Sequence, residues 1–120
     1  MRGIIPINPQ EIFNKLDSCI QALGKGNIVQ KQLGLKKAEA EKNYRVKYNQ
    51  KMLQLKAEKC QATLITSLAK SDPEVAELAM QRDIAESNYY TCISATENLR
   101  LEAEILRTKI AWLRTELKNS

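Results

Sequence analysis

Histidine is absent from this 120-residue sequence, and glycine, proline and aromatic residues are few. Without histidine the chain lacks the commonest zinc ligand and the commonest general base. Its four glycines form no phosphate-binding loop, because Gly24 and Gly26 lack the lysine and hydroxyl that a P-loop carries at the required spacing. We therefore expect no catalytic residue, no metal and no cofactor, and a protein that is not an enzyme.

Long apolar runs are also absent, and cysteines are few. No stretch approaches the roughly 20 apolar residues that span a bilayer. The run from Met1 to Pro6 is too short for the apolar part of a secretory signal. The three cysteines, Cys19, Cys60 and Cys92, are odd in number and lack metal-ligand spacing, which favours reduced thiols in a cytosolic protein. We expect a soluble, cytoplasmic protein of one domain, residues 1–120.

The net charge of +5 is unevenly spread along the chain. Residues 27–60 contain nine lysines or arginines against three acids, whereas residues 71–97 contain six acids against Arg82 alone. This asymmetry is more informative than the total charge.

The first half of the chain predicts two helices. Asn8 is a good N-cap and Pro9 suits the first helical position, so a short helix is expected over about 9–23. Gly24 and Gly26 are predicted to end it, because glycine takes the left-handed C-cap conformation without strain. A second, long helix is expected over about 27–60, followed by a corner or short helix over about 61–71.

The strongest start signal in the chain is Ser71-Asp72-Pro73-Glu74, which combines an N-cap residue, proline in the first turn and an acid near the positive end of the helix dipole. The following segment, to about residue 118, contains no further proline and no glycine. Its apolar residues recur in the 3-4 alternation of a coiled-coil seam, interrupted only by Arg82 and Thr96. The seam consists of Val75, Leu78, Arg82, Ala85, Tyr89, Cys92, Thr96, Leu99, Ala103, Leu106, Ile110, Leu113 and Leu117.

A helix over 73–118 would be roughly 69 Å long at 1.5 Å per residue. The predicted fold is therefore all-α, an elongated antiparallel helical hairpin of coiled-coil type with a short N-terminal helix. The hairpin would set the basic end of the second helix (Lys47, Lys51, Lys56, Lys59) beside the acidic start of the last helix (Glu74, Glu77, Asp83, Glu86).

Part of the sequence resembles a group of small helical proteins. The resemblance lies in the stretches Lys56–Ile65, Leu68–Asp72, Val75–Leu78 and Arg82–Glu86, followed by Tyr89 or Tyr90. The proteins of this group are encoded in phages and prophages of Gram-positive bacteria, often near recombination or early genes. The resemblance covers about residues 37–110 and lies in spacing rather than in a catalytic signature. It implies a phage-encoded accessory protein, of the kind that includes anti-defence inhibitors and DNA-metabolism accessories.

Basic residues form two candidate binding sites for an acidic protein or for phosphate. Arg100, Arg107 and Arg114 recur every seven residues, at intervals of about 10.5 Å along the last helix. Arginine suits bidentate binding of carboxylate and phosphate. The alternative is ordinary pairing with Glu102, Glu116 or the acids of the second helix. The second candidate set lies on the second helix and comprises Lys36, Lys37, Lys42 and Arg45.

The four tyrosines have two interpretations. Stacking on bases is one. The other places Tyr44, Tyr48 and Tyr89 in the seam with their hydroxyls at its edge, and leaves only Tyr90 outside. Arg82 stands in the seam itself, where it is expected to bond to an acid of the second helix or of a second chain, or else to remain solvated near the helix start. The acidic residues nearby have neither a pocket nor a histidine to support metal binding.

The last helix has a second apolar stripe, Leu101, Ile105 and Trp112, which points away from the seam. One antiparallel partner covers one face only, so the stripe predicts cover by the N-terminal helix or, preferably, by a second copy in a homodimer.

Three functions fit these features. The first is a phage or prophage accessory protein that binds and modulates a host protein complex through an extended helical surface. The second is a DNA- or RNA-binding accessory protein of phage recombination or replication, which uses the lysines of the second helix and the three arginines. The third is a structural assembly component. Strong salt dependence of DNA binding would favour the second.

Overall fold

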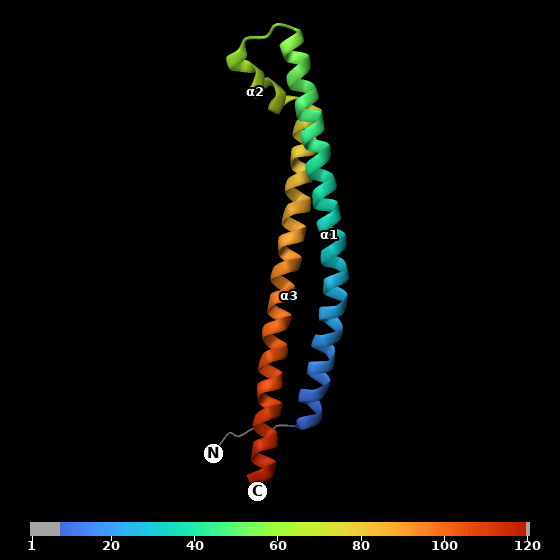
Figure 1. Cartoon of the computed structure of the whole chain (residues 1–120), viewed down its shortest axis with the longest axis vertical. Helices are drawn as coiled ribbons and strands as arrows, with labels where there is room; N and C mark the ends of the chain where they lie inside the picture. Colours follow the sequence, from blue (N-terminus) through green and yellow to red (C-terminus); the bar gives the residue numbers. More distant parts are fainter. Residues whose placement is uncertain (1–7, 120) are drawn as a thin grey trace. The chain divides into compact units, whose positions relative to one another are not determined.

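A computed structural model describes residues 8–119, which form three α-helices without a strand. α1 spans Pro9–Ala57, α2 spans Ala62–Ser71 and α3 spans Pro73–Asn119 (Figure 1). The prediction of an all-α fold is thereby confirmed. The expectation about a secretory signal concerns residues 1–6, which lie outside the described residues.

α1 begins where the sequence predicts. The side-chain oxygen Oδ1 of Asn8 accepts a hydrogen bond from the backbone N of Gln10 at 3.0 Å, so Asn8 is the N-cap. The predicted end at Gly24 is wrong, because α1 is a single helix of 49 residues that passes through both glycines. The short N-terminal helix and the second helix of the prediction are therefore one element.

Glycine in α1 serves close packing rather than termination. None of the three glycines in the helix has the positive φ of a C-cap. A Cβ on Gly26 would lie 3.3 Å from Oγ1 of Thr96, and one on Gly34 would lie 3.3 Å from the ring of Tyr89. The missing side chains leave room for these α3 residues. Gly24 has no such neighbour within 4 Å.

The corner between α1 and α2 is a hydrogen-bonded helix stop. Lys59 has a φ of 60°, in the left-handed region. The backbone N of Cys60 donates to the carbonyl O of Leu55 at 3.2 Å, and the N of Lys59 donates to the O of Lys56 at 3.1 Å. This pair of bonds is the Schellman motif, and Cys60 packs against the apolar cluster that contains Leu55. The predicted break near Cys60 is confirmed.

α2 folds back beside the end of α1 (Figure 1). Its buried residues are Ile65 and Ala69, which pack against Leu55. Tyr48, Met52 and Cys60 border this cluster. The ten-residue helix is thus held by one apolar face, while Leu64 and Leu68 on its other side are exposed.

α3 has the predicted start and seam. Val75, Thr96, Ala103, Leu106 and Ile110 are buried, as the 3-4 pattern requires. Leu117 departs from the pattern and is 74 % exposed. On α1, Ile20 is also exposed. It follows the buried Cys19 directly and is turned outward by one residue of helix rotation.

The contacts divide the chain into two compact units. Unit 1 comprises residues 1–29 and 92–120, and unit 2 comprises residues 30–91. In unit 1, Ile12 near the start of α1 shares a core cluster with Ile110 near the end of α3. In unit 2, Gly34 lies against Tyr89 and Lys51 reaches Asp72. Positions rise along α1 as they fall along α3, so the two helices are antiparallel within each unit.

Candidate interaction surfaces

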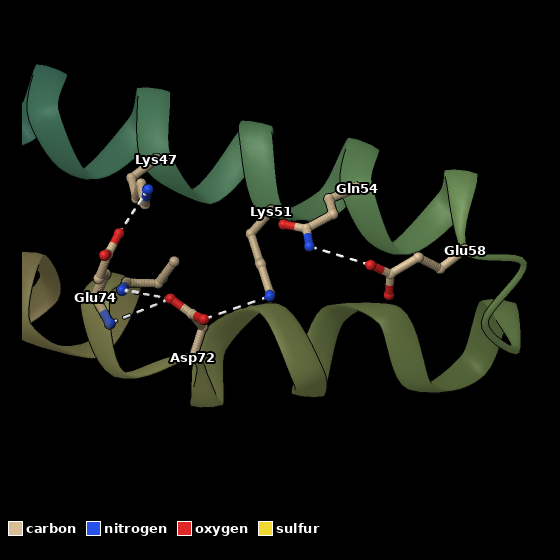
Figure 2. Close-up of polar contacts among 7 residues, drawn as sticks. Lys47, Lys51, Gln54, Glu58, Asp72 and Glu74 are labelled. Atoms are coloured by element: carbon tan, nitrogen blue, oxygen red, sulfur yellow. Dashed lines mark hydrogen bonds and ion pairs between the residues drawn. The ribbon is translucent and has the colours of Figure 1, made fainter.

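Two ion pairs link the end of α1 to the start of α3 (Figure 2). Lys47 pairs with Glu74, and Nζ of Lys51 lies 3.4 Å from Oδ1 of Asp72. The predicted meeting of the basic and acidic segments is confirmed at these two lysines. Lys56 and Lys59 are exposed, with no ion pair to any residue of the range 8–119.

Asp72 has a second role, as the N-cap of α3. Its Oδ2 accepts hydrogen bonds from the backbone N of Glu74 at 3.1 Å and of Val75 at 3.2 Å (Figure 2). The bond from Val75 and the nearby Lys51 ammonium favour the charged carboxylate and lower the pKa of Asp72. The hydrogen bond to Glu74 raises the pKa of Lys47. These charged groups therefore stabilise the connection between the end of α1 and the start of α3.

The basic face of α1 consists of Lys36, Lys37, Lys42 and Arg45. Lys36 and Lys42 are exposed and have no ion-pair partner within residues 8–119. Arg45 bonds to Glu41 at 3.1 Å, and Nζ of Lys37 lies about 6 Å above the rings of Tyr89 and Tyr90. A shallow hollow of about 350 Å³ is lined by three members of this face and by Ala38, Glu41, Val46 and Asn49.

The arginine row consists of Arg100, Arg107 and Arg114, and all three are exposed on α3. Arg100 bonds to Glu97 at 2.9 Å, three residues earlier on the same helix, rather than to the acids considered from the sequence. Arg107 and Arg114 have no ion-pair partner in the described part of the chain. Arg114 borders a hollow of about 320 Å³ in unit 1, where Phe13 of α1 meets Ile110 and Leu113.

The second apolar stripe is exposed, as the sequence predicts. Leu101 and Ile105 are each 57 % exposed and Trp112 is 67 % exposed. These values are high for large apolar side chains of a regular helix, and such groups mark contact sites more often than isolated surface residues do. The alternative that the N-terminal helix covers the second apolar stripe has no support within unit 1. The core of this unit contains Ile12, Leu16 and Leu23 of α1, but it contains no residue of the stripe.

Sequence reasoning missed four uncharged positions that continue this stripe. They are Ser94, Asn98, Thr108 and Thr115, and all are exposed. Together with Leu101, Ile105 and Trp112 they form what we call the outer stripe, spaced alternately by four and three residues. The same 3-4 count that located the seam would have found it, had polar uncharged residues been counted with apolar ones.

The tyrosines lie within unit 2 and contact cations. Tyr44 stacks on Tyr48 with ring centres 5.8 Å apart, and the guanidinium of Arg82 lies 4.2 Å above the ring of Tyr44. Arg82 also bonds to Asp83 at 3.1 Å, so its partners are an aromatic ring and a neighbour on its own helix. Tyr44, Tyr48 and Tyr89 are half-buried and Tyr90 is exposed, as the seam interpretation predicts.

All three cysteines are free thiols. Burial raises the pKa of Cys19, and the adjacent Glu102, which accepts a hydrogen bond from the thiol, raises it further. Cys92 donates to the carbonyl O of Gly26 at 3.8 Å across the seam of unit 1. A buried thiol with a raised pKa, as at Cys19, is a packing residue rather than a nucleophile.

Residues 8–119 contain no cluster of three or more cysteine or acidic side chains that would hold a metal ion. Within the same range, no helix has an apolar stretch sufficient to cross a bilayer.

Comparisons with known protein families, with curated proteins and with solved structures find no match to this chain.

Proposed function

We propose that this protein is a non-enzymatic binding protein that contacts a partner protein through the outer faces of its helices and associates with a second copy of itself. The observation that carries the proposal is the exposure of Leu101, Ile105 and Trp112 on a regular helix. Because the seam residues already hold α1 and α3 together, these side chains are available for contacts with other molecules.

The basic face of α1 supports an acidic protein as the partner. Lys47 and Lys51 are neutralised by Glu74 and Asp72, whereas Lys36 and Lys42 of the basic face are exposed and have no ion-pair partner within residues 8–119. Glu41 lies in the same hollow as Lys42 and Arg45. A carboxylate at this position repels a phosphate backbone, but it suits a protein surface that carries both signs of charge.

The resemblance of residues 37–110 to small phage and prophage proteins gives this proposal its biological setting. In that setting the protein acts in the bacterial cytoplasm on a host complex, such as a defence or nucleic-acid-processing complex. Free thiols agree with a reducing compartment.

Nucleic-acid binding is the second candidate. It is favoured by Arg107 and Arg114, which are exposed and unpaired within the described residues, and by the positive net charge of +5. Phosphate contacts by these arginines would make the affinity fall steeply with salt.

Affinity capture from a bacterial extract tests the choice of partner. The wild type is compared with Lys36→Glu/Lys42→Glu and with the matched control Lys56→Glu/Lys70→Glu, which makes the same charge change at exposed lysines elsewhere. We expect a host protein to be retained by the wild type and by the control but lost from the first variant. Retention by all three proteins contradicts the basic face as the contact, and nuclease-sensitive retention supports the second candidate.

Self-association is tested by sedimentation or light scattering at tens of micromolar protein. Trp112→Glu and Ile105→Glu should convert a wild-type dimer to monomer, because a charge is then buried without a partner. Ile20→Glu, at an exposed isoleucine of α1, is the control and should remain dimeric. A monomeric wild type, or dimers that survive both changes on α3, would contradict this part of the proposal.

A further inference from the structure

The outer stripe of α3 has the pattern of a coiled-coil contact surface. Its seven residues, at positions 94, 98, 101, 105, 108, 112 and 115, follow strict alternation of four and three, and none is charged. A repeat of 3.5 residues keeps one face of a helix against a partner helix over several turns. All seven positions belong to unit 1, so the surface does not depend on the placement of unit 2.

Two of the four polar members of the stripe, Thr108 and Thr115, can be buried at little cost. The hydroxyl of Thr108 donates to the carbonyl O of Glu104 at 3.0 Å, and that of Thr115 donates to the O of Ala111 at 3.1 Å. Both threonines therefore have their hydrogen bonds within α3 and can offer their methyl groups outward. A partner that removes water from them leaves neither hydroxyl donor unsatisfied.

Charged residues flank the stripe and distinguish the possible orientations of a second α3. In heptad order, the charged residues of one edge are Glu97, Glu104 and Lys118, and those of the other edge are Glu102, Lys109 and Glu116. A parallel pair would place Glu104 beside the partner's Lys109 but Glu97 beside the partner's Glu102. The attraction and the repulsion cancel, so charge gives no preference for a parallel pair.

An antiparallel pair with its two-fold axis between Ile105 and Thr108 gives only attraction. Glu102 then meets the partner's Lys109, and Glu97 meets the partner's Lys118, and symmetry repeats each pair. A shift by one heptad in one direction places Glu102 beside the partner's Glu102, and a shift in the other direction places Lys109 beside the partner's Lys109. Each shift therefore brings like charges together. Opposite charges that flank a seam set partner orientation in coiled coils, so this register is the one that the sequence of α3 favours.

The shape of the surface agrees with the same register. A hollow of about 600 Å³ on α3 is lined by Thr108, Ala111, Trp112, Thr115, Glu116 and Asn119. In the favoured register the partner's Leu101 faces Trp112, and the four residues around that point are 108, 111, 112 and 115. These four include only one large side chain, so a leucine has a hole to enter, as knobs-into-holes packing requires.

We infer that two copies of this protein associate through the outer stripe of α3, antiparallel, with the partner's Leu101 against Trp112 and the partner's Lys109 against Glu102. The inference rests on the self-association in the proposed function and adds its orientation and register. The interface is isologous, because the same surface is contributed by both copies.

Charge reversal tests the orientation, with dimer dissociation measured by sedimentation equilibrium at low ionic strength. Lys109→Glu and Glu102→Lys should each weaken the dimer by about tenfold, since two symmetric pairs change from attraction to repulsion. The double variant Glu102→Lys/Lys109→Glu restores opposite charges and should regain most of the affinity. Glu104→Lys is the matched control, which should leave the affinity within about twofold because the partner's Ala111 lies opposite.

The possible outcomes distinguish an error in the orientation and register of the dimer from an error in the self-association itself. A parallel pair is identified by a tighter dimer in Glu102→Lys and a weaker one in Glu104→Lys, and this result overturns the register while self-association stands. A monomeric wild type overturns both. Glu102 also accepts a hydrogen bond from Cys19, so circular dichroism of each variant must match the wild type. If Glu102→Lys unfolds, Glu104→Lys alone still decides between the orientations, because it should leave an antiparallel dimer within about twofold of the wild type and weaken a parallel one.

Discussion

Gly24 and Gly26 lie two residues apart in α1, but alanine should act differently at each position. A methyl group added to Gly24 would have no neighbouring atom within 4 Å, so Gly24→Ala gains the higher helix propensity of alanine without a clash. We expect the free energy of unfolding of this variant to rise by about 0.5–1 kcal/mol. Urea unfolding followed by circular dichroism measures the change.

Gly26→Ala is the internal comparison. The added Cβ would lie 3.3 Å from Oγ1 of the buried Thr96, whose hydroxyl already donates to the carbonyl O of Cys92. Crowding at this point offsets the gain in propensity, so the variant should be no more stable than the wild type. Equal stabilisation by both substitutions would contradict the close approach of α1 and α3 at Gly26.

Lys59 occupies a position at which glycine is the natural residue. A φ of 60° is strained for a side chain with Cβ, at a cost of about 1 kcal/mol. Lys59→Gly should therefore raise the free energy of unfolding by about that amount, provided that the two bonds of the helix stop are kept. Lys56→Gly, within the last turn of α1, should lower it instead. Thermal unfolding of both variants beside the wild type gives the comparison.

At the residue scale, the sequence shows where the glycines are, but it does not show whether a given glycine ends a helix or allows a close helix contact. A helix stop and a close helix contact both require the absence of Cβ. Only the position of Thr96 on α3 shows that Gly26 serves contact. Conversely, Lys59 gives no sequence signal for a left-handed conformation, because glycine is the residue that usually adopts it at a helix stop.

At the scale of a single element, the start of α3 depends on Asp72, the N-cap residue that precedes its first turn. Asp72→Ala removes both hydrogen bonds to Glu74 and Val75, and should lower the melting temperature by several degrees. Asp72→Asn keeps a capping oxygen and loses the charge that pairs with Lys51, so its effect at neutral pH should be smaller. Ser71→Ala is the neighbouring control, since the Ser71 hydroxyl bonds only within α2, to the carbonyl O of Ser67.

The same cap makes stability depend on pH in a defined direction. The folded-state pKa of Asp72 is lowered, so its contribution is complete above the ordinary pKa of an aspartate and is lost as the pH falls through the lowered value. Acid should therefore destabilise the wild type more than Asp72→Asn. Melting temperatures of the two proteins measured between neutral and strongly acidic pH should converge at the acidic end. Parallel curves would contradict the role of this carboxylate.

Elements differ in how fully sequence specifies them. The bounds of α3 are predictable to within a residue or two because a cap, a proline and an unbroken 3-4 pattern agree. The ion pairs of Lys47 and Lys51 follow from charge asymmetry and antiparallel order. The spacing of the outer stripe can be read from the sequence, but the suitability of Thr108 and Thr115 for burial cannot, since the hydrogen bonds that allow it exist only in the folded helix.

At the scale of the whole molecule, net positive charge predicts only weak binding to nucleic acid. Duplex DNA should bind the wild type at low salt and be released near physiological ionic strength, because Lys47, Lys51 and Arg100 are already paired with acids. Fluorescence anisotropy of a labelled duplex across a salt series measures this. Nanomolar, sequence-dependent binding at about 0.15 M salt would instead favour the nucleic-acid function.

The arrangement of unit 1 has a consequence for the order in which the protein folds. Every contact between α1 and α3 in this unit joins residues on either side of a loop of about 60 residues or more, whereas Leu55, Ile65 and Ala69 meet within a short segment. Closing a short loop costs less entropy, so the cluster beside α2 is expected to form early and the cluster around Ile12 and Leu106 late. Leu55→Ala should therefore slow refolding, while Leu106→Ala should chiefly speed unfolding, in stopped-flow measurements.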